Sequence, residues 1–275
     1  MPVLNVIGPK LGRCNICGAV GPLTEDHIPP KALAQNIALR LNHLVSVLGA
    51  EKAPPGTKMP DGIKFRSLCQ RCNGVVLSRY DKALVAMADQ VTAMLRTPIL
   101  LNGSQTVRVK PQLVARAVLG HLCALGINRY NEGDPQKFGE YVLNDQSTFL
   151  QDCRVCYWVY PFAGRTVARD LFITYTGTKI ASQVMIMKCY PIAFAIIVNK
   201  TLPLDGWQPP SFDFYASLGP DDEVEIPIYL DQIPDQIWPE MPHRDGNMVA
   251  MLGEAAYVAK LSSPRGQVLK NRLKR

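Results

Sequence analysis

Two Cys-x-x-Cys pairs are the residues of this chain best suited to bind a metal. Cys14 and Cys17 form the first pair, and Cys69 and Cys72 form the second about 50 residues later. Each pair can direct two thiolates at one ion, so the spacing predicts a four-cysteine zinc site. Because four thiolates leave no open position for a substrate, we expect this zinc to be structural. The alternative is four unrelated buried cysteines.

An Asp-His dipeptide lies between the two pairs. Asp26 and His27 stand in the sequence TEDHIPPK, and Asn73 directly follows the last cysteine of the second pair. Each residue also has a structural interpretation: His27 could hydrogen-bond a loop, Asp26 could cap backbone N–H groups, and Asn73 could be a helix N-cap. Glu25 is an alternative metal ligand that the spacing does not exclude.

The order Cys-x-x-Cys, Asp-His, Cys-x-x-Cys-Asn resembles the HNH (ββα-metal, His-Me finger) endonuclease family, and most closely its zinc-clamped four-cysteine branch, which includes the phage recombination endonuclease. The resemblance covers roughly residues 14–82. It implies that His27 is the general base that deprotonates the attacking water, and that Asp26 and Asn73 ligate one catalytic divalent ion. Carboxylate and amide oxygens suit Mg²⁺ or Mn²⁺, and a histidine with a pKa near 6.5 can accept a proton at physiological pH.

The resemblance further suggests contacts with DNA phosphates, for which the nearby basic residues are Lys31, Arg71, Arg79 and Lys82. The chain also departs from the family pattern in two places. Many members have an Asn shortly before the second pair that orients the histidine, but residues 63–68 (IKFRSL) contain none. Some zinc-clamped members carry an acidic ligand one turn beyond the Asn, where this chain has Val76 and Leu77.

The net charge of +7 is unevenly distributed along the 275 residues. Residues 1–82 contain 11 basic and 5 acidic side chains, residues 83–259 contain 13 and 18, and residues 260–275 contain 6 and none. Basic ends around an acidic middle suit a polyanionic partner such as DNA, although a basic tail could serve solubility alone. Four thiolates around one Zn²⁺ would reduce the positive charge of the first segment.

The composition favours a soluble, cytoplasmic protein with reduced thiols. The 47% hydrophobic residues are enough for a substantial core, which excludes a disordered chain. The first 13 residues contain no apolar run of signal-peptide length, and the longest apolar stretch, 189–198, is too short to cross a membrane. Eight cysteines without a leader indicate metal ligands and core thiols rather than disulfides.

Apolar periodicity indicates an α+β fold, with helices first and a mainly antiparallel sheet after them. Helical spacing covers residues 31–48, 73 to the residue before Pro98, 111–125 and 135–143, and strand-like runs cover 63–68, 153–160, 170–175, 183–190, 194–198 and 224–230. We expect a nuclease module over residues 1–97 and an α+β domain over 98–275 with a basic tail. The 31–48 helix could shape the substrate site, which we favour, or be a surface elaboration.

The remaining cysteines and histidines favour structural roles. Cys153 and Cys156 repeat the Cys-x-x-Cys spacing, but positions three apart on a strand point to opposite faces, so the two thiols should not converge. Cys123 and Cys189 are expected in the core. His43 and His121 lie in predicted helices, where each histidine is more often structural than a ligand.

Two classes of function follow from these residues. The first is a divalent-metal-dependent HNH endonuclease acting on DNA, in which residues 98–275 recognise a substrate, a protein partner, another copy of the chain or a signal that gates the nuclease. The second is a non-catalytic zinc module that binds nucleic acid. Loss of cleavage in a His27→Ala variant would distinguish the first from the second.

Overall fold

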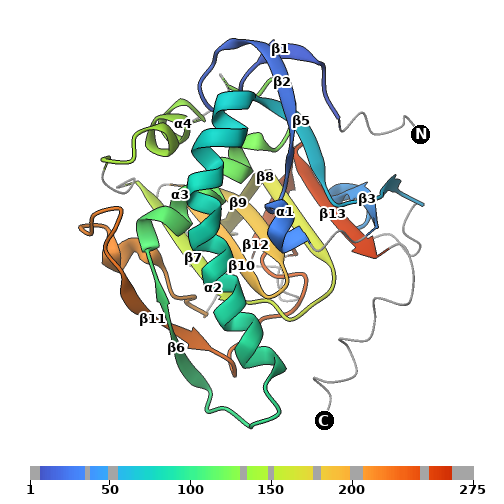
Figure 1. Cartoon of the computed structure of the whole chain (residues 1–275). Coiled ribbons are helices and arrows are strands. Elements are labelled where there is room, and N and C mark those ends of the chain that lie inside the picture. The colour runs from blue at the N-terminus through green and yellow to red at the C-terminus, as the bar shows by residue number, and fades with distance from the viewer. Residues whose placement is uncertain are drawn as a thin grey trace.

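The computed structural model describes residues 7–34, 38–48, 55–130, 135–147, 152–175, 181–198, 207–241 and 248–261. Within these ranges the chain is mixed α+β, with four α-helices and antiparallel sheets (Figure 1). The predicted fold class is therefore confirmed. The basic tail beyond residue 261 lies outside the described residues.

The largest sheet has eight strands in the order β4-β3-β13-β8-β9-β10-β7, with β12 also pairing with β8. All of its pairings are antiparallel. Its strands are β3 (Leu39–His43), β4 (Thr57–Met59), β7 (Cys153–Val159), β8 (Arg165–Tyr175), β9 (Ala181–Cys189), β10 (Ile192–Val198), β12 (Met248–Leu252) and β13 (Ala256–Leu261). The predicted strands at 153–160, 170–175, 183–190 and 194–198 all belong to this sheet, and β8 begins earlier than expected.

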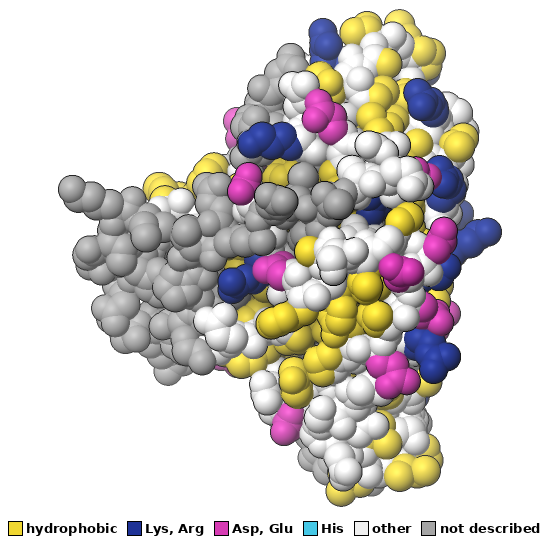
Figure 2. All heavy atoms as spheres, turned by 90° about the vertical axis from the view of Figure 1, so that its left-hand side faces the viewer, with side chains coloured by type: hydrophobic (Ala, Val, Ile, Leu, Met, Phe, Trp, Pro, Cys, Tyr) yellow, Lys and Arg dark blue, Asp and Glu magenta, His cyan; other side chains and the backbone are white. Residues whose placement is uncertain are grey.

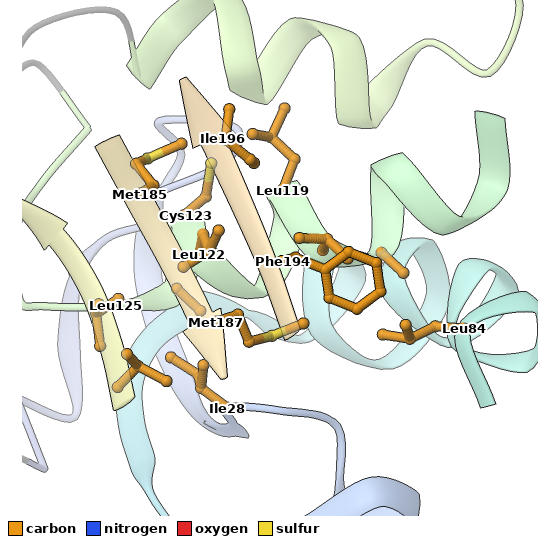
Figure 3. Packing of buried hydrophobic residues seen from close by; sticks show 14 of the residues in the cluster. Ile28, Leu84, Leu119, Leu122, Cys123, Leu125, Met185, Met187, Phe194 and Ile196 are labelled. Atoms are coloured by element: carbon orange, nitrogen blue, oxygen red, sulfur yellow. The ribbon is translucent and has the colours of Figure 1, made fainter. Parts of the chain in front are cut away.

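Both faces of the central strands are covered, which explains why β10 is apolar throughout. Phe194 and Ile196 belong to the apolar cluster on the helical side, whereas Ala195 and Ile197 belong to a second cluster that includes Trp158. A strand buried on both faces needs no alternation of polar and apolar residues. Figure 3 shows Phe194 and Ile196 of β10 packed with residues of helix α3.

Helix α3 (Pro111–Ala124) lies between the sheet and helix α2 (Ser78–Arg96). Almost every residue of α3 is buried, including the polar Gln112, Arg116 and His121, because the helix is covered on all sides. Helix α4 (Pro135–Leu143) packs against it, and β6 (Ser104–Val109) pairs with β11 (Val224–Tyr229) as a separate ribbon. The helices predicted at 111–125 and 135–143 and the strand at 224–230 are confirmed.

The N-terminal part contains a three-stranded sheet of β1 (Leu11–Arg13), β2 (Val20–His27) and β5 (Lys64–Cys69). A π-helical segment, Cys72–Leu77, follows β5 and continues into α2. The candidate metal ligands therefore include Asp26 in β2, Cys69 in β5, and Cys72 and Asn73 at the start of the helix. The predicted strand at 63–68 and the helix from residue 73 are confirmed.

The helix predicted over residues 31–48 is wrong. Helix α1 covers only Lys31–Ala34, residues 35–37 lie outside the described ranges, and Leu39–His43 forms strand β3. Leu39 and Leu41 point to the same face of β3 and are fully buried, because β3 pairs with β13 from the far end of the chain. Their spacing fits a strand as well as a helix, and the long-range pairing selects the strand.

The segment inserted between β2 and β5 therefore joins the large sheet, whose other strands come from residues 153–261. The division at residue 97 stays a prediction, but strand pairing and one apolar cluster both cross it. In place of the expected long helix, β3 extends the large sheet together with β4, and the substrate-shaping role of this segment stays a prediction.

Candidate functional site

The four cysteines meet, as the spacing predicted. The sulfur atoms of Cys14, Cys17, Cys69 and Cys72 all lie within 4.8 Å of one another, and those of Cys17 and Cys69 are 3.7 Å apart. Sulfur atoms at these separations could hold a structural ion such as Zn²⁺. Among the described residues, this is the one group of three or more His, Cys, Asp or Glu side chains close enough to share a metal.

The pKa values of two thiols in this cluster, Cys14 and Cys72, are shifted in opposite directions. Hydrogen bonding with Cys72 lowers the pKa of the Cys14 thiol to about 4, despite the opposing effect of burial. The same hydrogen bond, together with burial and the neighbouring sulfur atoms, raises the pKa of Cys72. Four thiolates repel one another, so a divalent cation is the natural source of balancing charge.

Local backbone geometry builds the first Cys-x-x-Cys turn. The Gly18 N–H donates to the Cys14 carbonyl at 2.9 Å, and Gly18 has a φ of +71°, a conformation that glycine adopts without a steric penalty. A Cβ atom at Gly18 would also lie 2.5 Å from the Tyr130 ring. This close turn brings the first two thiols together.

The first turn is anchored to the end of α3. Asn15 is fully buried, and its Nδ2 donates to the carbonyls of Cys123 and Gly126, both at 3.0 Å. The Arg129 N–H donates to Asn15 Oδ1 at 2.9 Å. The residue between the paired cysteines therefore binds carbonyl groups that the end of α3 leaves unpaired.

Asn73 lies in the first turn of the helix and is bonded to β2. Its Nδ2 donates to Thr24 Oγ1 at 2.9 Å and to the Glu25 carbonyl at 3.0 Å. Its Oδ1 has no hydrogen-bond partner among the described residues. The amide is thus held by its nitrogen, which leaves its oxygen available as a hard ligand for a cation.

Asp26 points to the same face of β2 as Thr24 and is almost fully buried. Its Oδ2 lies 2.9 Å from Nδ1 of His121 in α3, and Nε2 of His121 lies 2.8 Å from Oδ1 of Asp81 in α2. Burial opposes protonation of His121, but the two carboxylates outweigh it and raise its pKa to about 10. At neutral pH an imidazolium therefore links two carboxylates inside the protein.

His27 is the last residue of β2, and its side chain points to the opposite face from Asp26. Its Nε2 lies 3.7 Å from Oδ2 of Asp61 and has no hydrogen-bond partner in the described part of the chain. Burial lowers the pKa of His27, although the Asp61 carboxylate opposes this effect. Burial of His27 therefore favours the neutral form of its imidazole.

A row of alternating charges continues along the His27 face. Lys64 lies 3.0 Å from Asp61 and 3.4 Å from Glu25, and Arg66 donates to Glu25 at 2.6 Å. Glu25, the alternative metal ligand, is therefore occupied by two cations. Lys64 and Arg66 are the basic residues nearest to His27 on this face, since β5 pairs His27 with Lys64 and Glu25 with Arg66.

The four basic residues predicted to contact phosphates are exposed or partly paired. Lys31, Arg71 and Lys82 are exposed, whereas Arg79 donates to the Asp145 carboxylate at 2.7 Å. Figure 2 shows one face of the molecule, on which basic and acidic side chains are interspersed around an apolar centre. Among the described side chains visible on that face, the basic ones do not form a continuous positive patch.

The structure therefore gathers the predicted residues in two groups. Asn73 is bonded to Thr24, which lies on the same face of β2 as Asp26, whereas His27 lies at the end of that strand on its other face. The sequence interpretation missed His121, Asp81 and Asp61. His121 was expected to be structural because it stands in an apolar helix, and its two carboxylate partners lie 95 and 40 positions away.

The remaining cysteine predictions are confirmed. Cys153 and Cys156 pack into different apolar clusters on opposite faces of the large sheet, so their thiols do not converge. Cys123 and Cys189 are each only 1% exposed. Both stay outside the four-cysteine site.

No known family model, no curated protein and no solved structure matches this chain. No helix within the described ranges has the length and apolar character required to cross a membrane.

Proposed function

We propose that this protein is a divalent-metal-dependent HNH endonuclease that hydrolyses phosphodiester bonds in DNA. The observation that carries the proposal is that Asn73, directly after the last cysteine of the four-cysteine cluster, is hydrogen-bonded to Thr24 and Glu25 of β2, the strand that also carries Asp26 and His27. The order of these residues resembles that family, and two antiparallel strands followed by a helix agree with a ββα unit.

The oxygen atoms of Asp26 and Asn73 fit a hard divalent ion. Asp26 Oδ2 is bonded to His121, but Oδ1 has no hydrogen-bond partner among the described residues, and the same is true of Asn73 Oδ1. Mg²⁺ typically takes one or two protein oxygens and completes its shell with water and phosphate. When bound, such an ion would polarise the phosphate and stabilise the leaving oxygen.

His27 would act as the general base from the end of β2. Burial favours its neutral form, and its side chain is still 17% exposed, so a water molecule could reach it. The Asp61 carboxylate beside Nε2 favours a proton on that nitrogen, which leaves Nδ1 as the acceptor. Asp61 would thus take the orienting role that an Asn has in many family members.

Lys64 and Arg66 would hold the substrate backbone on the same face. Both are paired with acidic groups, and a phosphate could take over part of these pairings. Lys31, Arg71 and Lys82 add exposed positive charge from neighbouring segments.

The test is a cleavage assay on zinc-loaded full-length protein, with supercoiled plasmid and linear single-stranded and double-stranded DNA in Mg²⁺ or Mn²⁺. We expect cleavage that EDTA abolishes and that His27→Ala slows by about 10²- to 10⁴-fold, since that is the contribution of a positioned general base. His43→Ala is the matched control, because the ring of His43 stacks on Tyr257 with ring centroids 5.0 Å apart and, among the described residues, is not bonded to Asp26, His27 or Asn73.

Cleavage at the same rate in wild-type protein and His27→Ala would contradict the proposal. If neither protein cleaves but both bind DNA, the chain is a non-catalytic zinc-stabilised nucleic-acid-binding protein. A nuclease that becomes active only with an added ligand would instead support gating by residues 98–275.

A further inference from the structure

Helix α3 contributes a buried histidine to the proposed metal-ligand side of β2. The His121 side chain is only 2% exposed, and both of its ring nitrogens are bonded to carboxylates, Asp26 Oδ2 at 2.9 Å and Asp81 Oδ1 at 2.8 Å. The three residues come from β2, α2 and α3. One side chain therefore joins the Asp-His strand to the helical layer of the body.

This arrangement fixes the orientation of the Asp26 carboxylate. An imidazole bonded through both nitrogens cannot rotate without breaking a hydrogen bond, and α3 is itself buried along nearly its whole length. Asp26 is consequently held through Oδ2, while Oδ1 makes no hydrogen bond with the described residues. A carboxylate held by one oxygen presents the other in a defined direction.

We propose that His121 is a positioning residue for Asp26: through its bond to Oδ2 it holds Oδ1 in the orientation that a divalent cation requires. Asp81 holds His121 from the other side. This inference rests on the proposed function, because it assigns Asp26 as a cation ligand. It also assigns a role to α3, namely that the metal site of the N-terminal strands is completed by a helix of residues 98–275.

A purely electrostatic role for His121 and a positioning role predict opposite changes in cation affinity when His121 is removed. A positive imidazolium beside Asp26 repels a cation, so its removal would strengthen cation binding if charge dominated. If positioning dominates, removal weakens binding, because the carboxylate loses its orientation. Outer groups that orient metal ligands typically change metal affinity by about 10- to 100-fold.

The experiment compares zinc-loaded, full-length His121→Leu and His121→Gln with wild-type protein. Leucine has a similar volume but no hydrogen-bonding group, whereas glutamine keeps one amide donor for Asp26. Mn²⁺ affinity is measured from the electron paramagnetic resonance of free Mn²⁺, and zinc content and melting temperature report folding. We expect about 10- to 100-fold weaker Mn²⁺ binding in His121→Leu and partial recovery in His121→Gln.

Cleavage measured against Mn²⁺ concentration adds a second readout. We expect His121→Leu to need more Mn²⁺ for half-maximal cleavage, with a smaller loss of rate at saturating Mn²⁺. Unchanged or tighter Mn²⁺ binding in folded His121→Leu would overturn the inference, and so would an equal loss in the glutamine and leucine variants. If His121→Leu does not fold, Asp81→Ala is the second variant: it leaves the Asp26 bond but removes the acceptor that holds Nε2 of His121, so unchanged Mn²⁺ affinity would overturn the inference.

Asp26→Ala separates this inference from the proposed function. Mn²⁺ binding that requires Asp26, is weakened in His121→Leu and is accompanied by no DNA cleavage would reject the nuclease and keep the positioning role. Mn²⁺ binding that is the same in wild-type protein and Asp26→Ala would overturn both.

Discussion

The four-cysteine segment is partly exposed and the central sheet is buried, and different groups stabilise them. Around the cysteines, the buried Asn15 and Ser67 donate hydrogen bonds to backbone carbonyls near the end of α3. In the sheet, β10 is buried by apolar contacts on both faces. The cysteine segment therefore depends on a few specific partners, whereas the sheet depends on apolar area. Single substitutions should accordingly affect the two regions in different ways.

The largest expected effect is the loss of the metal cluster. We predict that Cys72→Ser removes bound zinc and exposes the amides of β1, β2 and β5 to hydrogen exchange, while β9 and β10 stay protected. Structural zinc contributes about 10–16 kcal/mol of binding free energy in small zinc modules, so its loss should exceed the stability of this segment. Cys189→Ala, at a buried thiol outside the cluster, is the control and should retain zinc. Full zinc retention in Cys72→Ser would refute this prediction.

The second largest effect is expected at the buried ion pair between Lys188 of β9 and Glu240. Lys188 Nζ lies 2.6 Å from Glu240 Oε2 and also donates to the carbonyls of Gln236 and Trp238. We predict that Lys188→Met lowers the free energy of unfolding by about 3–5 kcal/mol, because it leaves a buried carboxylate unpaired. The double variant Lys188→Met/Glu240→Leu should recover most of this loss. Denaturant unfolding measures both, and additive losses would contradict the explanation.

The same pair predicts a dependence of stability on pH. Burial lowers the pKa of Lys188, and Glu240 opposes that effect. Without Glu240, burial should lower the folded-state pKa of Lys188 further, so the unfolded state binds more protons between that lowered pKa and the unfolded value of about 10.4. Stability then rises with pH. We therefore expect the free energy of unfolding of Glu240→Leu to increase from pH 7 to pH 10 more steeply than that of wild-type protein. Parallel pH profiles would show that Lys188 stays charged.

The smallest expected effect is the difference in stability between alanine substitutions at Gly18 and Gly21, two glycines near the first Cys-x-x-Cys pair. Gly18→Ala should destabilise the protein by about 1–3 kcal/mol, because an alanine at a φ of +71° is strained and its Cβ would meet the Tyr130 ring. Gly21→Ala is the matched control, since nothing lies within 4 Å of a Cβ there, and it should change stability by less than about 0.5 kcal/mol. Thermal unfolding of the two variants tests this difference, and equal melting temperatures would contradict it.

Local patterns predicted the elements whose burial is uniform along the chain. Alternation and apolar runs identified the strands from β7 to β11, and periodicity identified α2, α3 and α4. Strand β2 was missed because its sequence, VGPLTEDH, contains Gly and Pro and is stabilised by β5 rather than by its own propensity. Strand β3 was taken for a helix because its partner β13 lies about 200 residues away.

Sequence spacing predicted the part of the candidate site that is formed within local turns. It did not predict the part that depends on contacts between residues far apart in the chain. Cys-x-x-Cys spacing identified the metal cluster because two residues of each pair come from one local turn. No such spacing connects Asp26 with His121, whose bond depends on how α3 packs against β2. Asp61 was missed for the same reason, because it approaches His27 only when β2 and β5 pair.

The central claim is that Asp26 and Asn73 bind one divalent cation within reach of His27. The most direct measurement is a crystal structure of zinc-loaded protein soaked in Mn²⁺, with anomalous maps collected on both sides of the manganese edge. We predict a manganese peak bonded to Asp26 Oδ1 and Asn73 Oδ1, with a metal-bound or adjacent water facing His27. Manganese found elsewhere, or absent while zinc occupies the four cysteines, would contradict the proposed function.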